Sequence, residues 1–125
     1  MKETELDELT HEVIGCALEV QKAMGNRFHK EIYKSCLAIE LTSFGIDFVQ
    51  DHEMDVYYNE TVAGTIDVDF LIEGKLIVDV KTIEKLDDTH RNHAIHICKA
   101  NKIADGLIIN FGAFPLECKK VYSKL

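Results

Sequence analysis

The feature that most restricts the fold of this chain is a pair of alternating segments within residues 65–83. They read TIDVDFLI and KLIVDVKTI, and Glu73-Gly74 separates them as a turn-forming pair. Alternation of apolar and polar residues with a period of two is typical of half-buried strands. The segments therefore predict an antiparallel hairpin, with Val68, Phe70 and Ile72 sharing one face of its first strand.

The register of this hairpin is fixed if both apolar rows face the core, because a one-residue slip would invert one strand. Closing the chain over Glu73-Gly74-Lys75 places Asp69 opposite Asp79, and Asp67 opposite Lys81. Two neighbouring carboxylates repel unless a cation or a proton lies between them. Open on one side, they suit a hard cation such as Mg²⁺ or Mn²⁺, with Lys81 positioning a water. The alternative is a solvated polar strand face with an Asp67–Lys81 salt bridge.

Periodicity outside the hairpin divides the rest of the chain into three helices and three strands. Apolar residues have helical spacing over three segments, 4–24, 28–44 and 89–103. Strand signals occur over residues 46–58, which end at an Asn59-Glu60 turn, and over residues 106–112 and 116–124. The order ααβββαββ predicts an α/β fold with a mixed central sheet flanked by helices, in a single domain spanning residues 1–125.

Composition and charge limit the classes of partner. A chain of 125 residues with 46% hydrophobic side chains is long enough to bury one core. Its net charge of −8 excludes nucleic-acid binding by general electrostatics, so any such function must lie in a local site. The charged N-terminus, the absence of a CxxC pair and the lack of a long apolar run predict a cytoplasmic protein outside the membrane.

The spacing of Asp69 and Asp79-Val80-Lys81, with nine residues between them, resembles the D…(D/E)xK signature of the PD-(D/E)XK nuclease fold. The chain from ELTHEVIGCALEVQKAMG to GLIINFG is similar to the GxxExxY family of small bacterial and archaeal proteins assigned to that fold. The matches include IYKSCLAIEL and VDFLIEGKLIVDVK. The resemblance implies a restriction-endonuclease-like core and a Mg²⁺- or Mn²⁺-dependent phosphodiesterase acting on DNA or RNA. In it, Asp69 and Asp79 would hold the metal and Lys81 would orient or activate water.

The naming motif of that family is only partly present. Tyr33 matches its tyrosine, whereas Arg27 and Lys30 stand in place of its glycine and glutamate. Since a first-helix glutamate often helps to hold the metal in this fold, the third acid would be Glu31, about 100° further round the helix, or Glu19. We expect Lys30 to place a positive charge near the acids instead.

A further site residue implied by the resemblance is His93, which stands where the family carries glutamine. It would contact the scissile phosphate or act as a polar neighbour of the site. Two functions are therefore open: a small metal-dependent nuclease, or a catalytically inactive relative serving as a binding or assembly module. Lys30 and the net charge of −8 support the second. Without a basic flank, an active form would need a homodimer or a protein partner to grip a duplex.

Overall fold

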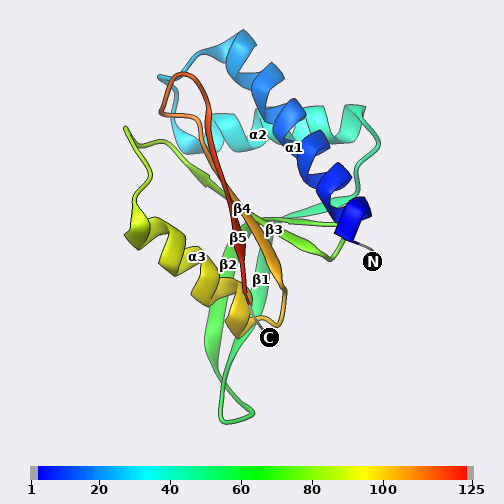
Figure 1. Ribbon diagram of the computed structural model, residues 1–125, viewed down its shortest axis with the longest axis vertical. Helices are drawn as coiled ribbons and strands as arrows, with labels where there is room; N and C mark the ends of the chain where they lie inside the picture. The colour runs from blue at the N-terminus through cyan, green and yellow to red at the C-terminus, as the bar shows by residue number, and fades with distance from the viewer. Residues whose placement is uncertain (1–2, 124–125) are drawn as a thin grey trace.

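The computed structural model describes residues 3–123 and contains helices and strands in the predicted order. The helices are α1 (Glu3–Met24), α2 (Lys30–Ser43) and α3 (Asp88–Ala100). The strands are β1 (Phe48–Tyr58), β2 (Thr61–Ile72), β3 (Leu76–Lys81), β4 (Asp105–Asn110) and β5 (Glu117–Tyr122). They form a sheet of spatial order β1-β2-β3-β4-β5 (Figure 1). The predicted ααβββαββ order and mixed α/β architecture are confirmed.

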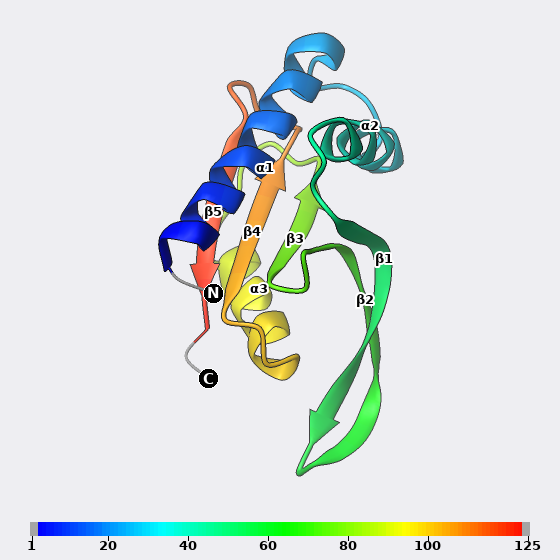
Figure 2. The same ribbon diagram turned by 90° about the vertical axis from the view of Figure 1, so that its right-hand side faces the viewer.

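Helices cover both faces of the sheet, with α1 and α2 on one side and α3 on the other (Figures 1 and 2). The β3–β4 pairing is parallel, with α3 as its crossover, and the other three pairings are antiparallel. Each face has its own apolar cluster, one under α1 and α2 and one under α3. Within residues 3–123, no helix combines the length and the apolar character that crossing a membrane requires.

β1 and β2 extend beyond the rest of the sheet as a two-stranded arm (Figure 2). β2 pairs with β3 only over Phe70–Ile72, whereas it pairs with β1 along nearly its whole length. At the tip of the arm, Asn59 and Glu60 have φ values of 49° and 64°. Positive φ at both central residues is what a two-residue type I′ hairpin requires. The turn predicted at Asn59-Glu60 is therefore confirmed.

One face assignment in the hairpin is wrong. The alternation predicted that Val68 shares a face with Phe70 and Ile72, but Val68 packs under α3 while the other two pack under α1 and α2. The strand turns over at this point, where Asp51 on the neighbouring strand has a φ of 53° and the pairing of β2 with β3 ends. Two-stranded ribbons twist more strongly than wide sheets, so a strict period of two does not persist along them.

Two glycines let the elements around α3 approach closely. A Cβ at Gly106 would lie 2.7 Å from Val121 Cγ2 and 2.8 Å from Cys98 Sγ, so β4 can pack directly against α3 only without a side chain there. A Cβ at Gly112 would lie 2.5 Å from both the N and the O of Ile83. The turn after β4 thus rests on the segment that leads from β3 to α3, and this contact helps to set the position of α3 over the sheet.

Candidate functional site

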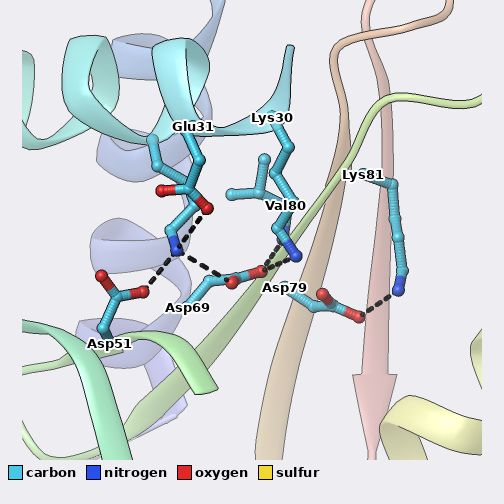
Figure 3. Close-up of polar contacts among 8 residues, drawn as sticks. Lys30, Glu31, Asp51, Asp69, Asp79, Val80 and Lys81 are labelled. Atoms are coloured by element: carbon cyan, nitrogen blue, oxygen red, sulfur yellow. Dashed lines mark hydrogen bonds and ion pairs between the residues drawn. The ribbon is translucent and has the colours of Figure 1, made fainter. Parts of the chain in front are cut away.

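Asp69 lies where β2 and β3 separate. The pairing of the two strands follows the predicted register as far as Phe70↔Val78, so that Asp69 and Asp79 come next in line. There the backbone ladder is replaced by a side chain, because the N–H of Val80 donates to Oδ2 of Asp69 at 2.8 Å. The carboxylate of Asp69 is thereby held in the gap between the strands, next to that of Asp79 (Figure 3).

A third carboxylate lies on the other side of Asp69. The β1–β2 pairs on either side place Asp51 of β1 opposite Asp69 of β2. Asp51, Asp69 and Asp79 therefore form a row across three neighbouring strands, here called the acidic row (Figure 3). Like charges at neighbouring positions of a sheet repel, so the row requires cations to be stable.

Two lysines from α2 supply positive charge to the acidic row. The ammonium of Lys34 donates to Asp51, and it lies 3.5 Å from Oδ1 of Asp69 and 3.4 Å from Oε1 of Glu31. Lys30, one helical turn earlier, lies with its Nζ 3.1 Å from Oδ2 of Asp69. The side chains of Lys34 and Asp69 are only 5% and 12% exposed, so water and salt screen this part of the network weakly.

Four residues predicted from the sequence line one pocket. Asp69, Asp79, Lys81 and His93 surround a cavity of about 190 Å³ between β2, β3 and α3, and Lys30 also lines it. Apolar side chains make up much of its remaining wall: Val68, Ile77, Val78, Ala94, Ile97, Cys98 and Leu107. The pocket therefore has a charged side toward α2 and an apolar side toward α3 and β4.

Lys81 does not form the salt bridge with Asp67 that was the alternative interpretation of the sequence. Its Nζ lies 3.4 Å from Oδ2 of Asp79, on the same strand. Among residues 3–123, no ion pair joins Lys81 to Asp67, although both line the pocket. The polar face of the hairpin is thus a pocket wall in which Lys81 stays beside Asp79.

The third acid suggested for the metal does not join Asp69 and Asp79. The side chain of Glu31 is 76% exposed and pairs with Lys34, and neither Glu31 nor Glu19 lines the pocket. Over the part of the chain that the structure describes, no group of three His, Cys, Asp or Glu side chains is arranged to hold a metal ion. Of the residues that the structure describes in α1 and α2, the one that lines the pocket is Lys30, and none of their carboxylates does.

The two central carboxylates differ in how readily they ionise. Burial alone would raise the pKa of Asp69, but the Val80 N–H and the Lys30 ammonium outweigh it and hold the pKa below its usual value. Burial raises the pKa of Asp79; Lys81 opposes this, and the neighbouring charge of Asp69 adds to it. The local lysines therefore stabilise Asp69 as an anion more than they stabilise Asp79.

A divalent metal ion does not fit this arrangement. Both oxygens of Asp69 face cationic or N–H donors, with Val80 and Lys30 on Oδ2 and Lys34 on Oδ1. Hard divalent ions need several oxygen ligands. Three carboxylates line the pocket, and two of them, those of Asp69 and Asp79, lie next to each other (Figure 3). Those two carboxylates are already matched by the ammonium groups of Lys30, Lys34 and Lys81, which repel a dication.

Tyr33, the tyrosine retained from the family motif, fixes the first turn of α2. Its ring is fully buried and stacks on Phe111 at 4.6 Å with an interplanar angle of 7°. Its hydroxyl donates to the carbonyl of Gly25 at 2.7 Å and accepts the N–H of Phe28 at 3.3 Å. These contacts anchor the start of the helix that carries Lys30 above the acidic row.

Sequence reasoning missed two members of the network, Lys34 and Asp51. Lys34 stands four residues after Lys30, and this spacing places both on one face of a helix, so the signal was present. Asp51 becomes recognisable only once β1 is aligned with β2, which the sequence did not fix. Nothing in the sequence indicates that Asp51 has a positive φ.

Comparisons with known proteins identify a family and a similar fold. The family model described as "PD-(D/E)XK nuclease superfamily" matches residues 7–121. The crystal structure of SSO0001 is similar with a TM-score of 0.57 and 14% identity, over 77% of this chain and 51% of that one. This likeness concerns the fold alone, and the chain spans about half the length of the solved one. No curated protein matches the chain.

Proposed function

This chain belongs to the PD-(D/E)XK nuclease superfamily, and we propose that it is a catalytically inactive member that binds nucleic acid at the pocket without metal-dependent cleavage. The ion pair between Lys30 and Asp69 carries the proposal. Its 3.1 Å separation places an ammonium group against the carboxylate that a metal-dependent mechanism would need free. The superfamily suggests nucleic acid as the ligand, and the net charge of −8 confines binding to a local site.

Lys81 and His93 are the donors that we assign to one phosphate of the ligand. Both line the pocket, and the side chain of Lys81 is 27% exposed, so a phosphate can reach it from solvent. Affinity for nucleic acid then depends on few ionic contacts. A plot of the logarithm of the association constant against the logarithm of the salt concentration should therefore have a slope of about −1 to −2.

The test is fluorescence anisotropy with short single- and double-stranded DNA and RNA in EDTA, together with a cleavage assay in Mg²⁺ and Mn²⁺. We expect metal-independent binding, no products, and a loss of affinity of about tenfold in Lys81→Ala, the size of one charge-assisted hydrogen bond. Lys75→Ala, on the exposed β2–β3 turn, is the matched control and should bind like wild type. Wild type that binds no nucleic acid would contradict the proposal.

A second candidate function is a Mg²⁺- or Mn²⁺-dependent nuclease with Asp69, Asp79 and Lys81 as the core of its site. One observation favours it: these three residues and His93 line the same pocket. Calorimetric titration of Mn²⁺ into wild type, Asp69→Asn and Asp79→Asn separates the two candidates. If wild type binds Mn²⁺ saturably and cleaves nucleic acid, and both variants lose the binding and the cleavage, the chain is the nuclease and the proposal of an inactive binding module is wrong.

We also propose that the chain is a single-domain member of the GxxExxY family within this superfamily. Support comes from the match over residues 7–121 and from Tyr33, which has a defined structural role at the motif position. A homodimer or a protein partner remains the predicted assembly, because the net charge of −8 opposes the grip of one copy on a duplex. Light scattering on the purified chain measures its mass in solution and tests this.

A further inference from the structure

We infer that Lys30 determines the cation specificity of the pocket: its ammonium group serves as the resident cation, and replacing it with a carboxylate converts the pocket into a divalent-metal site. The inference deepens the proposed function, because it concerns the same pocket and explains why no metal is needed there. It separates the roles of the two lysines that α2 brings to the acidic row.

The two lysines differ in burial and in the number of their partners. The side chain of Lys34 is 5% exposed and contacts Asp51, Asp69 and Glu31, so it is part of the packed structure. The side chain of Lys30 is 38% exposed, and within residues 3–123 its one ion pair is with Asp69. A substitution of Lys30 therefore disturbs fewer packed contacts than a substitution of Lys34.

The geometry at Lys30 suits a metal ion once its charge is reversed. A glutamate side chain is one bond, about 1.5 Å, shorter than a lysine side chain. Since Nζ of Lys30 lies 3.1 Å from Oδ2 of Asp69, a carboxylate at this position would stand about 4 Å from that oxygen. That gap matches an ion bound to both oxygens at about 2.1 Å. Asp79, beside Asp69 in the same pocket, would supply a third carboxylate.

The change of charge at position 30 also favours the binding of a divalent ion. Lys30→Glu changes the charge next to the ion by two units, from repulsion to attraction. At about 5 Å from a dication, this change raises the affinity at least roughly 100-fold even at the dielectric constant of water. Lys30→Gln removes only the positive charge and should raise the affinity about tenfold.

Calorimetric titration of Mn²⁺ into the purified chain tests the inference without any assay of activity. Lys75→Glu is the matched control, because it makes the same change in net charge on the exposed β2–β3 turn, away from the acidic row. We expect no saturable heat at millimolar Mn²⁺ in wild type or in Lys75→Glu. We expect saturable binding in Lys30→Glu, with a rise in Tm on adding Mn²⁺ that Asp69→Asn abolishes.

Two results would overturn the inference. One is wild type that binds Mn²⁺ as tightly as Lys30→Glu; the other is a folded Lys30→Glu that gains no affinity. Circular dichroism establishes folding, and Lys30→Gln gives the answer if the acidic variant does not fold. Failure here is distinct from failure of the proposed function, which is measured as nucleic-acid binding by wild type in EDTA.

Discussion

The substitution Lys34→Met tests whether the buried ammonium group holds the first two strands to α2. Methionine keeps most of the length of the side chain and its packing but removes the charge. Asp51 and Asp69 would then face each other without the cation that separates them. We therefore expect a folded but substantially less stable protein.

The size of the effect follows from burial. Removing one partner from a buried ion pair costs about 3–5 kcal/mol. The lower end applies, because Asp51 and Glu31 are 56% and 76% exposed and can be hydrated, and because Lys30 still neutralises Asp69. A loss of about 3 kcal/mol corresponds to a fall in Tm of about 10 °C in a chain of this length.

The pH dependence gives the same prediction a second test. Burial alone would lower the pKa of Lys34, but the hydrogen bond to Asp51 and the charge of Asp69 outweigh it and raise the pKa above 10.5. A raised lysine pKa stabilises the fold fully below pH 10.5, and this contribution is lost as pH rises through the folded pKa. The difference between wild type and Lys34→Met should thus persist from pH 7 to 10 and shrink above that.

Urea denaturation followed by circular dichroism at pH 7 measures the difference, with Lys75→Met as the control for loss of an exposed lysine. Lys34→Met/Asp51→Asn should recover part of the lost stability, because it removes one of the unpaired carboxylates. The reasoning fails if Lys34→Met lies within about 0.5 kcal/mol of wild type, the usual range for a surface substitution.

Three further outcomes follow from the structure. Because burial raises the pKa of Asp79, its ionised form destabilises the fold at neutral pH. Asp79→Asn should therefore raise Tm at pH 7 and leave it unchanged near pH 3, and a lower Tm at pH 7 would contradict this. Gly112→Ala should cost about 2 kcal/mol in urea denaturation, because its Cβ would meet backbone atoms of Ile83 at 2.5 Å. Burial raises the pKa of Cys98 to about 11, so at pH 8 iodoacetamide should modify it far more slowly than in urea, as mass spectrometry would record.

The hairpin around Glu73-Gly74 could be predicted closely because its information is local. Next to the turn, alternation sets the faces, as it does for Phe70 and Ile72 but no longer for Val68. The turn sets the register, and Glu73 and Gly74 have the φ values of 50° and 68° that such a turn needs. The element order followed from periodicity in the same way. The placement of Asp69 beside Asp79 therefore required no knowledge of distant parts of the chain.

The rest of the site depends on contacts between distant segments. The approach of α2 to the strands is set by Tyr33 stacking on Phe111, residues 78 positions apart in sequence, and periodicity does not contain that information. The ends of α3 also differed, since periodicity predicted a helix over residues 89–103 and the structure has it over Asp88–Ala100, with Asp87 as its N-cap. Helix ends depend on which side chain captures the free N–H groups, and neighbouring polar residues compete for this.

The arm has a consequence for how copies of the chain meet at high concentration. β1 is an edge strand, and an unpaired strand edge is a template for sheet growth between molecules. Along β1, however, Asp51, Glu53 and Asp55 alternate on an exposed face. If two arms paired edge to edge, these carboxylates would come together and repel each other, and this repulsion opposes fibril formation. This protection depends on the ionisation of the carboxylates. It would be lost on storage in acid, because protonated carboxyl groups no longer repel each other.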